Sequence, residues 1–442
     1  MMQNDTVAAR RPRRDLPATV AFCRIVWKSE ETSSNSEARP ADHPGEKGQI
    51  VSSDSPYTIS EDEYLAATGE EISTTLNLDT WQAGVDIGAL YQRIQAEVGP
   101  AIALERRVQQ TVRDRLFPML RTAQDAPKEA GVHTAKVADL DEVHRKVLFS
   151  GELETCDGTT ATHDTLLMTV TQIGICLVSY QGNELTLSQR LFRRDLRAVA
   201  KDPVGEVKAL LERRRSRAAT DVNDRRDTMA ELGRRGIMTY AERAALLGRS
   251  KAAWRMGHGN IAPYELLTGS GNMTLLETGL EVLRKLVAYK QFVFVPSAIK
   301  DRVLLTVGGA LQPLEYAVIS TAQTAMDRIV SSGHYEEGYA AKAESFVREI
   351  GPQIVLGVYR ASAHSPATPF FAHADCVHLA AHIAMADSAL QEHRGFPLSI
   401  DLADAACRAM FGADTFDDAV TAAYHLHGEP TRYFPERYTR EK

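Results

Sequence analysis

Apolar and polar positions follow different periods in the two main parts of the chain. Between Trp81 and Arg121, apolar residues recur every three or four positions with arginine and glutamine between them, which is the spacing of amphipathic helices. From Val147 onward, β-branched and aromatic residues form short dense runs bounded by Gly-Asn and Gln-Gly pairs. Such runs predict a meander of strands joined by turns. We therefore expect helices first and a sheet after them.

Helices and strands then alternate along the rest of the chain. A helical pattern containing "YAERAALL" precedes a strand "AAWRMG", a helix "TLLETGLEVLRKLVAYK" and the apolar strand "QFVFVPS". The last third continues with a long helix around "PLEYAVISTAQTAMDRIV", a strand "QIVLGVYRAS", an edge-like strand "ATPFFAHAD" and two more helices. A helix followed by a buried strand is typical of an α/β domain. The predicted fold class is α/β, with a mixed sheet and flanking helices.

Three parts are predicted along the chain. Residues 1–75 form a largely disordered arm, because the stretch from Lys28 to Asp62 is rich in Ser, Glu, Pro and Asp and has too few large apolar residues to offset the entropy of ordering. Residues 76–140 form a helical extension. Residues 141–442 form the main domain.

Composition says more about where the protein works than about what it does. The chain has 442 residues, 44% of them hydrophobic, so it can bury a large core. Because the formal net charge is -7, any contact with nucleic acid must come from a local basic face. No apolar run suits a membrane span or a secretory signal, and the five cysteines include no CxxC pair. We expect a cytoplasmic protein without disulfides, and the absence of Walker, GxSxG and GxGxxG motifs disfavours ATPase, esterase and Rossmann functions.

The first candidate for chemistry is Asp157-Gly158 in "CDGT", at the end of a predicted strand. A carboxylate there can bind Mg²⁺ or Mn²⁺, since hard cations prefer oxygen ligands and glycine leaves their approach open. Asp-Gly is also the commonest turn dipeptide, so a plain turn is the alternative. His258-Gly259 follows a second strand in the same way. With Glu242 on the intervening helix, three metal ligands could converge, unless His258 is only a loop residue held by the backbone.

Three further groups of residues could bind a metal or phosphate, but each also has a purely structural interpretation. His378 and His382 share a helix face in "HADCVHLAAHIAMAD", which suits a transition metal, but the segment has no HExxH pattern and is typical of a packed helix. Glu265 is either a replacement ligand or an acid at a helix start. A group of arginines suits phosphate binding, although interleaved acids make a salt-bridged helix face the default interpretation. This arginine set comprises Arg190, Arg193, Arg194, Arg197, Arg213, Arg214, Arg215, Arg217, Arg225, Arg226, Arg234 and Arg235.

The order of these motifs resembles the NurA nucleases, partners of HerA-type hexameric translocases in DNA end processing and prokaryotic defence. The resemblance runs from about Val147 to Ala422. It is carried by "CDGT" after a strand, a Glu-bearing helix, a strand ending in "HG", and a closing segment from "VYRAS" to "HRGFPLSIDLADAACRAMFG". It implies a ribonuclease H-like fold over residues 141–442 and a deoxyribonuclease that uses Mn²⁺ or Mg²⁺. Two cations in such a site bridge the scissile phosphate.

The resemblance also assigns roles to residues. Asp157 matches the first family Asp and Asp404 the C-terminal acid, while His258 stands where the family has a second Asp. Imidazole can bind Mn²⁺ but does not bridge two cations as a carboxylate can, so activity would be altered, rescued by Glu265, or lost. The implied metal ligands are Asp157, Glu242, His258 and Asp404, with Glu265 as a further catalytic residue and Glu231 as a rival to Glu242.

The implied partners are DNA, a HerA-like hexameric ATPase and a second copy of the chain, with no membrane. The arginine set would then follow the DNA, and the helices before Val147 would contribute to docking. Two alternatives stay open: a non-catalytic subunit of the same fold that grips DNA and a translocase, and an unrelated α/β binding module. A fold that keeps Asp157 and His258 apart would favour the binding module.

Overall fold

A computed structural model describes residues 59–430, except 82, 83, 85, 125, 165–167, 195–201, 203, 206, 209, 210, 212–230 and 300. The chain divides into two compact units, Met1–Gly99 and Pro100–Lys442. Most of the predicted arm lies outside the described residues. The side chains of Glu231 and of most of the arginine set also lie outside them; those of Arg190, Arg234 and Arg235 are described.

The described part of the first unit is helical. Helix α1 (Glu61–Thr68) starts with a capping box, in which the Glu63 amide donates to the Ser60 hydroxyl and Glu63 accepts from the Ser60 amide. Helix α2 (Ile72–Leu76) follows. Helix α3 (Ile87–Thr111) begins in this unit, carries the predicted apolar spacing, and has no buried residue. None of the described helices is long and apolar enough to cross a membrane.

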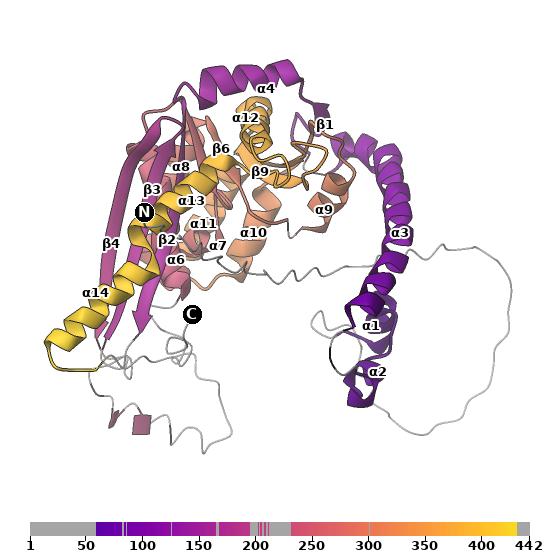
Figure 1. Ribbon diagram of the computed structural model, residues 1–442. Coiled ribbons are helices and arrows are strands. Elements are labelled where there is room, and N and C mark those ends of the chain that lie inside the picture. The colour runs from indigo at the N-terminus through magenta and orange to yellow at the C-terminus, as the bar shows by residue number, and fades with distance from the viewer. Residues whose placement is uncertain are drawn as a thin grey trace, which may run out of the picture. The chain divides into compact units, whose positions relative to one another are not determined.

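The second unit is built on one sheet of nine described strands, in the order β1-β7-β8-β9-β6-β5-β2-β3-β4. Figure 1 shows β2, β3 and β4 side by side in this sheet. Strands β2, β3 and β4 form the predicted antiparallel meander, and β2, β5 and β6 run parallel. The sheet is mixed and carries flanking helices, so the predicted α/β fold class is confirmed. The strands are β1 (Gly131–Thr134), β2 (Leu153–Asp164), β3 (Met168–Ser179), β4 (Gly182–Arg194), β5 (Trp254–His258), β6 (Phe292–Val295), β7 (Glu315–Thr321), β8 (Ile354–Tyr359) and β9 (Thr368–His373).

Two predictions for the last third of the chain are wrong. The segment predicted as one long helix is strand β7 followed by helix α10 (Gln323–Ser332). Its first half is buried between β1 and β8, where its β-branched residues fit a sheet better than a helix. Strand β9 is not at an edge, because it pairs with both β6 and β8 and all its residues are buried.

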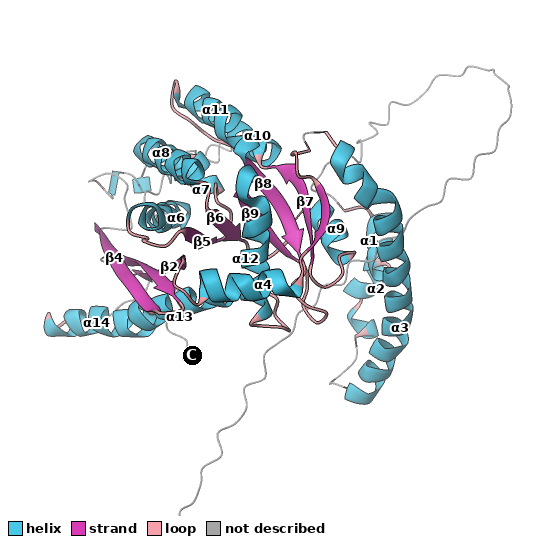
Figure 2. Cartoon of the chain, turned by 90° about the horizontal axis from the view of Figure 1, so that it is seen from above, coloured by secondary structure: helices cyan, strands magenta, loops and turns pink. Residues whose placement is uncertain are grey.

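Helices cover both faces of the sheet (Figure 2). Alternate residues of one strand serve the two layers: Phe292 and Phe294 pack with α6 and α8, whereas Val293 and Val295 pack with α12. The first layer comprises α6 (Glu231–Gly248), α7 (Tyr264–Leu267), α8 (Met273–Tyr289), α10 and α11 (Tyr339–Ile350). The second comprises α4 (Val137–Val143), α12 (Val377–Ala389) and α13 (Leu398–Phe411). Helices α9 (Arg302–Gly309) and α14 (Ala413–Leu426) cover the sheet toward its two ends.

A buried carboxylate connects the second layer to β2. Asp387 of α12 is 0% exposed and accepts hydrogen bonds from the Tyr180 hydroxyl and from the Ser399 hydroxyl and amide at the start of α13. Thr155 of β2 donates to the Ser399 hydroxyl over 2.8 Å. Burial nevertheless raises the pKa of Asp387 from its usual 3.8 to about 6.

The raised pKa of Asp387 predicts that stability falls as pH increases. The folded state binds this proton more tightly than the unfolded state, so the stabilisation is complete below pH 3.8 and is lost as pH rises through about 6. The free energy involved is about 3 kcal/mol. Urea unfolding at pH 4 and pH 7 should show a larger loss in wild type than in Asp387→Asn, and an equal loss in both proteins would contradict this prediction.

Candidate active site

Asp157 lies within strand β2 and not at its end. The strand continues to Asp164 because β3 pairs with it along its whole second half, and so the predicted turn at Asp157-Gly158 is absent. The parallel pairing with β5, however, stops at Cys156 and Gly257. Asp157 is therefore the first residue of β2 beyond its last pair with β5, where its side chain can meet the residue that ends β5.

The pleat of β2 sends successive side chains to opposite layers. Thr155 bonds to Ser399 of α13, and Asp157 follows on the same face, where the Cys407 thiol of α13 donates to its carbonyl oxygen. Cys156 packs instead in the core formed with α6 and α8, and Gly158 faces α6. Asp157 and helix α6 thus lie on different faces of the strand.

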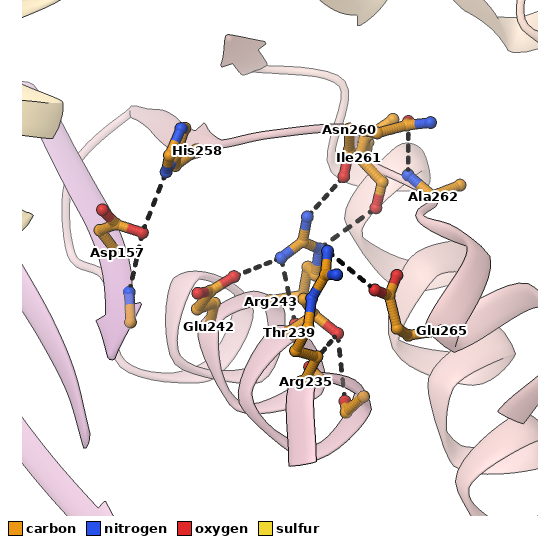
Figure 3. A network of polar contacts seen from close by, with 12 residues as sticks. Asp157, Arg235, Thr239, Glu242, Arg243, His258, Asn260, Ile261, Ala262 and Glu265 are labelled. Carbon is orange, nitrogen blue, oxygen red and sulfur yellow. Dashed lines mark hydrogen bonds and ion pairs between the residues drawn. The ribbon is translucent and has the colours of Figure 1, made fainter. Parts of the chain in front are cut away.

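His258 is the partner of Asp157. It is the last residue of β5, and its Nδ1 atom lies 3.4 Å from Oδ1 of Asp157 (Figure 3). The Asp157 carboxylate also accepts a hydrogen bond from the Gly158 amide over 2.9 Å. The edge of the imidazole meets the Phe396 ring, which precedes α13. The hydrogen bond to Asp157 raises the pKa of His258, and the charges of Asp157, Glu242 and Asp404 act in the same direction.

Glu242 has a different partner. It lies on α6, is 4% exposed, and accepts a hydrogen bond from the neighbouring Arg243 (Figure 3). Burial raises the pKa of Glu242 to about 7, although the Arg243 charge opposes this shift. Its other oxygen approaches the sheet at Gly158, where a β-carbon would lie only 2.6 Å away. The chain can bring α6 this close to β2 because residue 158 has no side chain.

The remaining predicted site residues pair with arginines elsewhere. Glu265 forms an ion pair with Arg235 over 3.0 Å, and Asp404 of α13 pairs with Arg408 one turn later. Asp404 is close enough to influence the pKa of His258. The structure therefore brings Asp157 and His258 into contact, places Glu242 and Asp404 within electrostatic range of His258, and gives Glu265 a separate partner.

The histidines of α12 belong to another cluster. His378 bonds to the Tyr316 hydroxyl over 2.8 Å and to Glu129 over 3.1 Å, and His382 packs edge-on against Tyr316. Among the described residues, no group of three or more His, Cys, Asp and Glu side chains is arranged to hold a metal ion. Both the predicted centre and this helix are thus without a preformed three-residue ligand set within the described part of the chain.

Arg243 is the residue that the sequence interpretation missed. It is 1% exposed, one of the largest fully buried side chains, and its cation lies over the Phe294 ring at 5.0 Å. In the sequence it follows Glu242 in a helix rich in arginine, so it reads as one more solvent-facing charge. The signal that could have separated it is its place in "ERAALL", beside apolar residues that the same helix buries.

The four charged groups form two neutral pairs. Asp157 can neutralise a protonated His258, and Glu242 neutralises Arg243. The side chain of His258 is 35% exposed, compared with 7% for Asp157, so the imidazole is the member of its pair that an incoming ligand can reach. This arrangement can bind an anionic group through imidazolium, or a cation after His258 loses its proton.

Comparison with known proteins gave matches among solved structures alone. No protein-family model matches the chain, and no curated protein matches it. The NurA nuclease from Sulfolobus solfataricus is 9% identical, with a TM-score of 0.39 over 77% of this chain and 98% of that one. A structure of NurA with manganese is 7% identical, with a TM-score of 0.36 over 66% and 96%. Ciona intestinalis endonuclease V bound to an inosine-containing DNA is 11% identical, with a TM-score of 0.25 over 58% and 84%.

The close approach at Gly158 predicts a steric cost. A β-carbon there would meet Glu242 at 2.6 Å and Met238 at 2.7 Å, so Gly158→Ala should lower the free energy of unfolding by about 1–3 kcal/mol. Gly248, the last residue of α6, has no atom within 4 Å of its would-be β-carbon. Gly248→Ala is therefore the control, with a change of no more than about 1 kcal/mol. Chemical denaturation measures both, and similar values for the two variants would contradict this packing.

Proposed function

We propose that the chain is a metal-dependent DNA nuclease of the NurA type. The observation that carries the proposal is the contact between Asp157 on β2 and His258 at the end of β5, the adjacent parallel strand, in a ribonuclease H-like strand order. Ligands in open α/β sheets bind beyond the carboxyl ends of parallel strands. The motif resemblance described above supports the same activity, with HerA-like translocases and DNA end processing or antiviral defence as its setting.

The donors at this edge fit one divalent ion better than two. Carboxylate oxygen and imidazole nitrogen are both ligands of Mn²⁺, and Mg²⁺ is commonly held by one or two protein groups with water and substrate phosphates. Asp157 and His258 provide two such groups, while Glu242 and Asp404 are already paired with arginines. When bound, the ion would polarise the phosphate and lower the pKa of a coordinated water.

The protein's own contribution is to orient the two ligands. The Gly158 amide fixes one oxygen of Asp157, and that oxygen in turn holds His258. The Phe396 ring, which precedes α13, contacts the imidazole of His258 and restricts its movement. On the face of α6, the Arg235 side chain is 55% exposed and is the described member of the arginine set nearest in sequence to Glu242. We propose that this face follows the DNA backbone, since arginine matches phosphate geometry.

The pairing of each acid near His258 with a basic side chain favours a second candidate function, DNA binding without cleavage. A subunit that grips DNA without cleaving it would need the fold and the basic face but no assembled metal centre. The described residues contain no preformed three-ligand group, and each acid near His258 already has a basic partner. Cleavage assays separate this candidate from the nuclease.

Cleavage should depend on Asp157. With Mn²⁺ and either single- or double-stranded DNA, Asp157→Ala should reduce the rate on the order of 100-fold or more, because it removes a ligand and the partner of His258. Glu315→Gln is the control: Glu315 is also a buried acid, but it lies on β7 and pairs with Arg113. Undiminished cleavage by Asp157→Ala would refute the site. Wild type that binds DNA without cleaving it would favour the second candidate.

We also propose a homodimer that docks onto a HerA-like hexameric ATPase, with the helices before Val147 contributing part of the contact, including contact between the two copies. Helix α3 supports this, since its apolar residues Ile87, Leu90, Ile94 and Val98 are 42–73% exposed and contiguous apolar surface usually marks an interface.

Charge on this helix face should therefore disrupt assembly. Light scattering of the full chain should show a dimer for wild type and a monomer for Leu90→Asp/Ile94→Asp. The control Gln92→Asp/Ala96→Asp adds the same charge to the opposite side of α3 and should leave the dimer intact. A monomeric wild type, or dimers of both variants, would overturn this role for α3.

A further inference from the structure

The guanidinium of Arg243 is fixed inside the protein by four acceptors. It donates to Glu242, to the Thr239 carbonyl one turn earlier in α6, and to the carbonyl oxygens of Asn260 and Ile261. Asn260 and Ile261 belong to the loop that directly follows His258 and Gly259. The guanidinium is thus held from both α6 and the end of β5. A cation with this many buried partners cannot swing toward a substrate phosphate.

Glu242 is separated from the other site acid by the strand itself. Its helix packs against the face of β2 that presents Cys156 and Gly158, whereas Asp157 shares the other face with Thr155, which bonds to Ser399 of α13. One oxygen of Glu242 lies against Gly158 and the other accepts from Arg243. A metal ion that bridged Asp157 and Glu242 would have to compete with a buried arginine for one of these carboxylates.

We infer that Arg243 takes the place of a second metal ion as the counter-charge of Glu242, so that the site binds a single divalent ion at Asp157 and His258. This inference rests on the proposed nuclease function and departs from the two-cation arrangement that the family resemblance implies. It assigns Glu242 and Arg243 a positioning role: together they fix α6 against Gly158 and fix the loop that follows His258. Water and substrate phosphates would complete the coordination of the single ion.

The departure at position 258 agrees with this inference. Imidazole offers one nitrogen to a metal and does not bridge two ions, whereas a carboxylate can. The chain therefore lacks a bridging acid at the end of β5 and carries a fixed positive charge beside the helix acid. The missing acid and the fixed positive charge both lower the affinity of the site for a second ion. The charge of Arg243 also removes the need for a second ion to neutralise Glu242.

The number of Mn²⁺ ions bound per full-length chain tests the inference directly. Electron paramagnetic resonance of free Mn²⁺ during titration with MnCl₂, without DNA, gives both stoichiometry and affinity. Wild type should bind one ion. Asp157→Asn should weaken binding at least tenfold. Glu242→Gln/Arg243→Met removes the second pair with no change in net charge, so it should still bind one ion, because neither side chain is a ligand, although with lower affinity because the loop after His258 loses its anchor. Glu315→Gln is the control for replacement of a buried acid, and circular dichroism confirms folding.

The outcomes separate this inference from the proposed function. Two ions bound by wild type, or no ion bound by a folded double variant, would overturn the inference, while Mn²⁺-dependent DNA cleavage could still stand. If the double variant does not fold, the stoichiometry of wild type alone decides between one ion and two. No binding by wild type would overturn the inference, and if DNA cleavage is absent as well, the nuclease proposal is overturned with it.

Discussion

The burial of Arg243 against Glu242 is the interaction on which the arrangement of the site depends. A buried charge is costly unless it is paired and fully hydrogen-bonded. Arg243 meets this condition with one carboxylate and three backbone carbonyls, two of them on the loop after β5. Arg243 therefore fixes the orientation of α6 relative to the loop that follows His258. The approach of α6 to the sheet in turn requires a glycine at position 158.

The same strand that carries Asp157 separates the two charged pairs. Asp157 and His258 lie on the face of β2 that α13 covers, and His258 is partly exposed. Glu242 and Arg243 are buried between α6 and the sheet. The network of Asp387, Ser399 and Thr155 supports the first face, because it fixes the start of α13 against β2. One face thus offers ligands to solvent, and the other holds the helix in place.

Much of the fold could be predicted from local sequence. The meander, the helix with Glu242 and the strand ending at His258 follow from residue periods that the structure preserves. Strand β7 was missed because its apolar run continues into α10 without a breaker, and only its pairing with β1 and β8 makes it a strand. The turn at Asp157-Gly158 was wrong for a related reason, since β3 extends β2 beyond the dipeptide.

The site was harder to predict than the fold. The contact between Asp157 and His258 could be anticipated, because each follows a short apolar strand segment, although Asp157 lies within β2 and only His258 ends its strand. Asp157 and Glu242 lie on opposite faces of β2 because of the register of that strand. Arg243 is buried because the loop after β5 packs over it, and this loop is remote from α6 in sequence. Neither relation appears in the sequence around those residues.

Anomalous diffraction from crystals soaked in MnCl₂ would show how many ions the site holds, because it locates each ion relative to named side chains. We expect one Mn²⁺ peak per chain, bound by Asp157 and His258, with Arg243 still hydrogen-bonded to Glu242. A second peak bound by Glu242, or a single peak remote from His258, would contradict this expectation.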